Sequence, residues 1–97
     1  MIKHIVCFKI KEEYKDQILH AKNTLESMKG NVAEVVDLQV GIDFLHSERS
    51  YDLILEVLLK SKEDLESYQK NEYHCQVVKT LMHKIRSASI AVDYEIE

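Results

Sequence analysis

Three residues with side chains suited to proton transfer face inward in the sequence pattern: Tyr68, His74 and His4. Tyr68 and His74 fall on the apolar side of a predicted helix, and His4 alternates with Val6 and Phe8 along a predicted strand. An imidazole titrates near physiological pH and can accept a proton from an acidic carbon or hydroxyl, while a phenol can donate to a developing oxyanion. The sequence therefore indicates His74 and Tyr68 as a candidate catalytic pair, with His4 as an orienting partner.

The six-residue spacing between Tyr68 and His74 conflicts with an unbroken helix. Six helical steps leave two side chains about 120° apart around the axis. For the pair to meet, the helix has to kink or break between them. The segment Lys70–Glu72 contains Asn71, the weakest helix former in the region. We therefore predict an irregularity there.

The other histidines and the two cysteines are predicted to carry no chemistry. The histidines show none of the HxH, HxxxH or HExxH spacings of metal sites, so no metal is expected. Those predicted to be solvent-facing or flanking, with no role, are His20, His46 and His83. Cys75 points about 100° away from its neighbour His74 on a helix, so a Cys–His nucleophile is not expected. Without a glycine-rich phosphate loop, no nucleotide cofactor is expected either.

Hydrophobic periodicity indicates the strands and helices that position these residues. Their order predicts an α+β, ferredoxin-like β-α-β-β-α-β domain. The expected strands are Lys3–Lys11, Ala33–Val40, Tyr51–Lys60 and Ser87–Glu97, and the expected helices are Glu12–Lys29 and a segment from Ser61 to about Arg86. Gly30 after Lys29 is typical of a helix end, and Ser61 with Asp64 is typical of a helix start. Gly41 is expected to close the second strand, and a polar hairpin loop is expected at Asp43–Ser50.

Two amphipathic helices can cover only one face of the four-stranded antiparallel sheet. The other face is expected to expose apolar side chains, namely Ile5, Cys7, Ile54, Leu58, Ile90, Val92 and Tyr94. A stable monomer rarely leaves such a patch in water. The strand pattern therefore predicts a homodimer that packs through the helix-free face of the sheet.

The bulk properties limit the class of protein. Ninety-seven residues make one domain, 1–97, and the net charge of -4 with interleaved bases argues against nucleic acid or an anionic membrane as partner. No apolar run is long enough for a signal peptide or a membrane span. Cys7 and Cys75 lack the spacing of a redox motif and are interpreted as reduced thiols. We expect a cytoplasmic protein.

Several of these residues together resemble the stress-responsive A/B barrel (Dabb) family over essentially the whole chain. They are the opening Ile2–Lys9, Gly41, the Tyr68 and His74 pair, and Asp93-Tyr94. The resemblance implies a dimeric α/β barrel. In the plant polyketide cyclase of this family, which makes olivetolic acid, a tyrosine and a histidine matching Tyr68 and His74 catalyse an intramolecular aldol condensation without a cofactor. A first-strand histidine matching His4 lines its cavity.

The resemblance also suggests which residues would line a substrate cavity here: His4, Val6, Phe8, Leu53, Leu55 and Val77. Bulky aliphatic side chains at such positions would instead fill the space and leave no site. The antibiotic-biosynthesis and haem-degrading monooxygenases have a similar architecture and are characterised by an Asn/Trp/His arrangement. Because this chain has no tryptophan, we set that group aside.

Two classes of function stay open at this point. The first is a cofactor-free small-molecule enzyme or binder that uses His74, Tyr68 and His4. The second is a non-catalytic stress-associated or interaction module in which His74 is structural, satisfied by a backbone carbonyl or a tyrosine hydroxyl. The space next to His74 discriminates between them, because a pocket of a few hundred Å³ favours the first and a filled core favours the second.

Overall fold

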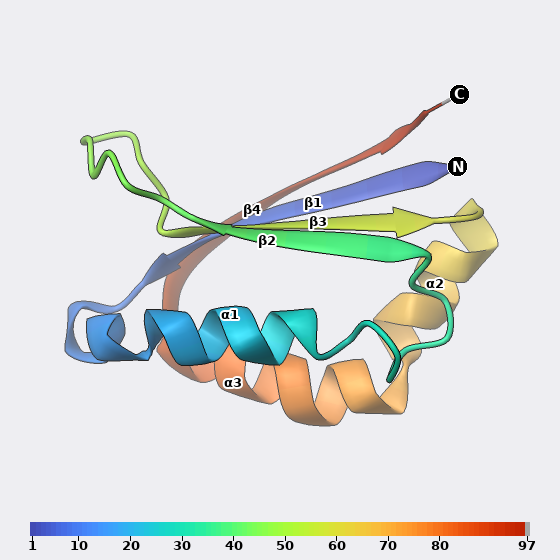
Figure 1. Ribbon diagram of the computed structural model, residues 1–97, viewed down its shortest axis with the longest axis horizontal. Helices are drawn as coiled ribbons and strands as arrows, with labels where there is room; N and C mark the ends of the chain where they lie inside the picture. The colour runs from blue at the N-terminus through green and yellow to red at the C-terminus, as the bar shows by residue number, and fades with distance from the viewer. Residues whose placement is uncertain (97) are drawn as a thin grey trace.

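The computed structural model describes residues 1–96 and shows one antiparallel sheet with all helices on one side (Figure 1). Its elements are β1 (Ile2–Ile10), the 3-10 helix η1 (Glu12–Gln17), α1 (Ile18–Glu26), β2 (Asp37–Ile42), β3 (Leu53–Leu59), α2 (Lys62–Lys70), the π-helical turn η2 (His74–Lys79), α3 (Thr80–Ile85) and β4 (Arg86–Glu95). The strands lie in the order β2-β3-β1-β4, and every neighbouring pair is antiparallel. This is the predicted ferredoxin-like α+β fold.

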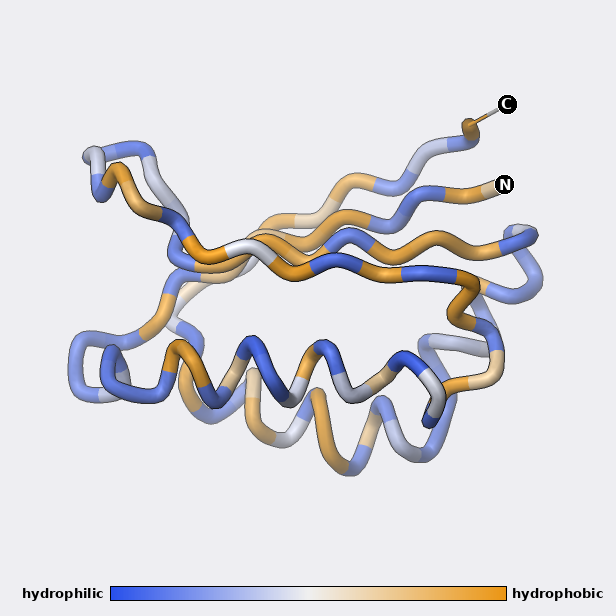
Figure 2. The backbone as a smooth tube through the Cα atoms, in the orientation of Figure 1, coloured by the Kyte–Doolittle hydropathy of each residue, from blue (hydrophilic) through white to orange (hydrophobic). Residues whose placement is uncertain are grey.

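The core lies between the sheet and the helices. On β3, alternate side chains from Leu53 to Leu59 are buried, and the hydropathy colouring alternates along the strands in the same way (Figure 2). From the first helical region, Ala21, Leu25 and Met28 are fully buried against this face. The predicted helical stripe and strand parity are therefore confirmed. Residues that share one periodic face fold toward one core because burial of apolar surface dominates the energetics.

The second strand is shifted from its predicted position. We expected Ala33–Val40, but β2 runs from Asp37 to Ile42, and the preceding residues form turns. Gly41 therefore lies inside the strand and does not close it. A Cβ at position 41 would lie 3.1 Å from Cγ2 of Ile54 on the adjacent strand, so this glycine permits close approach of a side chain.

The first predicted helix is composite, because η1 precedes α1 within Glu12–Lys29. The helix ends at Glu26, earlier than the predicted Lys29, and Gly30 lies in the turn that follows, with φ 93°, a backbone conformation that suits glycine. Just before it, the Lys29 Nζ donates to Asp37 at 2.7 Å, which ties the end of this helical region to the start of β2.

The second helical region is broken where the sequence predicts an irregularity. The Ser61 hydroxyl accepts from the Asp64 N–H at 3.1 Å and begins α2 as expected. The helix ends at Lys70, and Asn71 has an extended ψ of 133°. The Asn71 carbonyl side chain then accepts from the His74 N–H at 3.0 Å, which starts the next helical segment. The single predicted helix is thus three segments: α2, η2 and α3.

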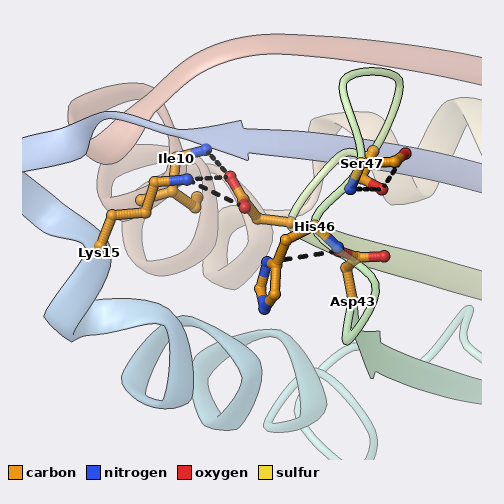
Figure 3. Close-up of polar contacts among 7 residues, drawn as sticks. Ile10, Lys15, Asp43, His46 and Ser47 are labelled. Atoms are coloured by element: carbon orange, nitrogen blue, oxygen red, sulfur yellow. Dashed lines mark hydrogen bonds and ion pairs between the residues drawn. The ribbon is translucent and has the colours of Figure 1, made fainter.

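A polar cluster fixes the ends of β1, η1 and β3 together (Figure 3). The Asp52 carboxylate accepts from the Ile10 N–H at 2.7 Å and from the Lys15 Nζ at 2.9 Å. Burial of Asp52 acts to raise its pKa, but the hydrogen bonds from Ile10 and Lys15 outweigh it, so the pKa lies below its ordinary value. Beside it, in the predicted loop between β2 and β3, the exposed His46 imidazole lies 3.5 Å from Asp43.

The helix-free face of the sheet is apolar, as predicted. Side chains of β4 on this face stay open to solvent, with exposed fractions of 51% for Ile90, 57% for Val92 and 44% for Tyr94. In the strand register Ile5 lies opposite Val92 and Cys7 lies between Ile90 and Ile54, so these side chains form an apolar patch, with Lys3 and Glu56 also on this face. Within residues 1–96 no helix is long and apolar enough to cross a bilayer.

Candidate functional site

Three aromatic side chains from separate elements meet under the sheet. The Tyr68 ring of α2 lies between the other two, with its centroid 4.3 Å from that of His74 and 5.5 Å from that of His4. Tyr68 and His74 are nearly parallel at 25°, whereas Tyr68 and His4 meet edge to face at 66°. All three are buried, with exposed fractions of 0%, 7% and 5% for Tyr68, His74 and His4. The structure thus brings the three predicted residues together.

The hydrogen bond of His74 determines which ring nitrogen is free. Its Nδ1 lies 3.0 Å from the backbone oxygen of Tyr68, and a carbonyl can only accept, so Nδ1 carries the proton and donates. The Nε2 lone pair then has no partner in the described part of the chain. In that part, Oε1 of Glu34 is the only side-chain N or O atom that is both fully buried and without a hydrogen-bond partner. Since Nε2 of His74 also has no partner, it is not fully buried and remains accessible.

Burial holds the pKa of His74 at about 4, below the 6.5 of a free imidazole. The hydrogen bond from Nδ1 to the Tyr68 carbonyl opposes this effect, and the positive charge of Lys79 and the neighbouring His4 add to it. His74 is therefore neutral at pH 7. A neutral imidazole with one bonded donor and one open lone pair is a proton acceptor.

The Tyr68 hydroxyl hydrogen-bonds to a thioether and not to an imidazole. It donates to Sδ of Met28 at 3.6 Å, so Tyr68 and His74 contact each other through stacked rings and not through a hydroxyl–imidazole hydrogen bond. Burial, together with the negative charge of Asp93, raises the pKa of Tyr68, so its hydroxyl stays protonated. A thioether is a weak acceptor that a better acceptor can replace.

His4 is held by a carboxylate from the neighbouring strand. Asp93 lies opposite His4 in the β1–β4 register, and its Oδ1 contacts Nδ1 of His4. Because a carboxylate can only accept, Nδ1 of His4 donates in this contact. The sequence reasoning gave Asp93 no role of its own. Its parity with Ala91 and Ser89 on the helix-facing side of β4 could have indicated one.

A cavity of about 210 Å³ opens beside these side chains. Among the residues expected to line it, His4, Val6, Phe8 and Leu55 do so, together with Tyr68 and His74. Val78 also lines it, and the sequence reasoning missed the other lining residues, which are Leu25, Gln69, Lys79, Met82, His83, Arg86, Ser89 and Ala91. The small side chains of β4 contribute no bulk, which explains why space remains here.

Two expected lining residues are placed elsewhere. Leu53 is packed into the core with an exposed fraction of 2% and lies two residues along β3 from Leu55. Val77 is 41% exposed and points outward, while Val78 lines the cavity instead. The π-helical turn causes this change. Its i→i+5 hydrogen bonding puts more residues in each turn than an α-helix has, so the next residue on the same side as His74 is Val78 and not Val77.

The remaining nucleophiles and metal ligands do not form a site. Between residues 1 and 96 no three His, Cys, Asp or Glu side chains group closely enough to hold a metal ion. Burial and the negative charge of Glu56 raise the pKa of the Cys7 thiol, which lowers its fraction of nucleophilic thiolate. The Cys75 thiol donates to the Gln69 carbonyl oxygen at 3.3 Å. Of the histidines predicted to have no role, His83 lies at the cavity rim, a position the helical pattern did not reveal.

Comparison with known proteins places this geometry in a wider context. The sequence matches the family described as the stress responsive A/B barrel domain over residues 2–96. No curated protein sequence matches the chain significantly.

Three solved structures illustrate how widely the fold is shared. A protein from Arabidopsis thaliana is 17% identical with a TM-score of 0.86, over 100% of this chain and 96% of that one. A dimeric ferredoxin-like protein of unknown function from Thermobifida fusca is 19% identical with a TM-score of 0.85, over 98% and 90%. An antibiotic biosynthesis monooxygenase is 15% identical with a TM-score of 0.77, over 100% and 99%. At these identities the likeness concerns the fold alone.

Proposed function

Because the chain belongs to the stress responsive A/B barrel family, whose match spans residues 2–96, we propose that its cavity is a cofactor-free site for a small molecule and that His74 accepts a proton there. The observation that carries the proposal is the accessible Nε2 of His74, a neutral acceptor beside a cavity of about 210 Å³. Ligand pockets commonly measure about 300–1,000 Å³, so this one suits a small ligand.

The proposed reaction begins with proton transfer from an acidic carbon or hydroxyl of the ligand to Nε2 of His74. The proton on Nδ1 stays on its hydrogen bond to the Tyr68 carbonyl, which stabilises the imidazolium that forms. The Tyr68 ring holds the imidazole in place by stacking, and its hydroxyl would donate to the developing oxyanion if the ligand oxygen displaced Met28 as acceptor. His4, oriented by Asp93, lines the same cavity.

Hydrogen–deuterium exchange at an acidic carbon tests this proposal. A panel of small 1,3-dicarbonyl compounds in deuterated buffer, followed by NMR, measures proton abstraction without knowledge of the natural substrate. We expect wild type to accelerate exchange of at least one compound and His74→Gln to lose most of that acceleration, because general-base catalysis contributes about 10²- to 10⁴-fold. The exposed His20 supplies the matched control, since His20→Gln removes one imidazole far from the cavity. Equal acceleration by wild type and His74→Gln would contradict the proposal.

A specific observation also supports the alternative, a non-catalytic module with a structural His74. The bond from Nδ1 of His74 to the Tyr68 carbonyl spans the break at Asn71 and joins α2 to η2. In that case His74→Gln would lower the free energy of unfolding strongly, and no small molecule would perturb the cavity. Thermal-shift screening of wild type and His74→Gln side by side separates the two functions.

A homodimer through the helix-free face forms the second part of the proposal. The exposed apolar side chains of β4 continue onto β1 and β3, and packing against a second copy would remove them from water. The dimeric ferredoxin-like protein from Thermobifida fusca, which shares this fold, is consistent with such an assembly. The two sheets would then form a dimeric α/β barrel.

A cytoplasmic location, expected from the free thiols, stays a prediction.

A further inference from the structure

The rim of the cavity carries a line of basic side chains. Lys79, His83 and Arg86 follow one another at intervals of four and three residues, so they share one face of α3 and its ends. Val78 and Met82, each one position earlier, form the apolar wall of the same cavity. The helix therefore presents an apolar stripe to the interior and a basic stripe to the mouth.

The cavity is cationic although the chain as a whole is acidic. The protein has 17 acidic and 13 basic residues, yet none of the residues that line this cavity is a carboxylate. Asp93, which contacts Nδ1 of His4, is not among the lining residues. Lys79 and Arg86 form no ion pair with any carboxylate that the structure describes. Their charges are therefore not neutralised at the mouth.

Both cations are held in place by neutral oxygen atoms. The Lys79 Nζ donates to the Gln69 carbonyl oxygen at 3.1 Å, and the Arg86 guanidinium donates to the Ser89 hydroxyl at 3.1 Å. Each group keeps further N–H donors beyond these bonds. The charge of Lys79 reaches into the cavity, because it contributes to the lowered pKa of His74.

We propose that the ligand of this cavity is a small carboxylate, with its apolar part against Val78 and Met82 and its carboxylate at the rim between Lys79 and Arg86. This inference rests on the proposed function, since it names the substrate class of the same site. The planar guanidinium can bind a carboxylate through two parallel hydrogen bonds, and the ammonium supplies a second positive charge. The volume of about 210 Å³ limits the buried part to a single ring or a short chain.

Pairs of isosteric probes test the inference: benzoate against benzamide, and hexanoate against hexanamide. Binding is followed by NMR at the His74 ring protons and the Met82 methyl group, for wild type and for Lys79→Gln/Arg86→Gln. We expect the carboxylates to bind wild type about 10- to 100-fold more tightly than the amides, in line with charge-assisted hydrogen bonds. The double variant should bring carboxylate affinity down to the amide level. Higher salt should weaken carboxylate binding and leave amide binding unchanged.

Lys84→Gln is the matched control, because Lys84 lies on the same helix but does not line the cavity. It should retain the preference for carboxylates. If amides and carboxylates perturb His74 with equal affinity in wild type, the cavity binds small molecules but the proposed substrate class is wrong. If none of the four probes perturbs His74 or Met82, both the small-molecule site and this inference are overturned.

Discussion

His74 and Tyr68 contact each other twice, once through the bond from Nδ1 to the Tyr68 carbonyl oxygen at 3.0 Å and once through rings stacked 4.3 Å apart. Both contacts depend on the break at Asn71, because a continuous helix would separate the two side chains by about 120°. The break thus places the open Nε2 at the cavity.

The buried neutral His74 makes stability depend on pH between about 6.5 and 4. Above 6.5 neither the folded nor the unfolded chain holds the His74 proton, so this residue contributes no pH dependence. Between 6.5 and the folded value of about 4, the unfolded chain binds a proton that the folded chain does not, so stability falls as pH falls. Below 4 both states are protonated and the loss levels off. Urea unfolding across this range should show a smaller decline for His74→Gln than for wild type. His20→Gln, at an exposed position, should not change the slope.

Removal of the Asn71 cap should weaken the site without a change at any lining residue. Asn71→Ala leaves the His74 N–H without its acceptor, and such losses cost about 0.5–2 kcal/mol. A loosened helix start admits water, so the pKa of His74 should rise from about 4 toward 6.5 in an NMR titration. Asn71→Ser keeps a neutral cap acceptor and should preserve both stability and the low pKa. An unchanged His74 titration in Asn71→Ala would contradict the role given to the cap.

The ring of Tyr68 should contribute more to the free energy of unfolding than its hydroxyl does. Tyr68→Phe removes only the contact to Met28, so it should lower the free energy of unfolding by less than about 1.5 kcal/mol. Tyr68→Ala removes a fully buried ring and should cost about 3–5 kcal/mol. Chemical denaturation measures both. If Tyr68→Phe proves as destabilising as Tyr68→Ala, stacking is not the principal contact.

The ionised carboxylate of Asp52 should stabilise the end of the sheet where β1 ends and β3 begins. Its pKa is lowered, so its contribution is present at neutral pH and is lost as pH falls through the folded value. Asp52→Asn weakens the bonds to the Ile10 N–H and the Lys15 ammonium, and we expect a loss of about 1–2 kcal/mol at pH 7. Asp37→Asn, which removes an equally short but exposed ion pair with Lys29, should cost much less. Equal losses would show that burial of Asp52 adds nothing.

A charge on the helix-free face should dissociate the proposed dimer. Val92→Arg places a cation in the middle of the apolar patch, and sedimentation velocity at micromolar concentration should then show monomers. Leu19→Arg makes the same change at a side chain that is 62% exposed on α1, and it should leave the dimer intact. A dimer that survives Val92→Arg but not Leu19→Arg would assign the interface to the helical side.

The sequence by itself determined the order of elements and the inward direction of three residues. The alternation on β3 and the spacing of Ala21, Leu25 and Met28 are local patterns, and each has one way to bury its apolar side. The same reasoning placed Tyr68 and His74 inside and required the break at Asn71. These features depend on neighbours within a few residues, which a linear pattern records.

Only the tertiary structure decided where space remains and which groups line it. Val78 replaces Val77 in the cavity because a π-helical turn shifts the face of the helix, and local periodicity assumes a regular α-helix. Asp93 reaches His4 through strand pairing across 89 positions of sequence. The basic rim meets the site only because η2, α3 and β4 contribute to one cavity. Such contacts join residues far apart in the chain, so their geometry follows from how all the elements pack together and not from the pattern of any one of them.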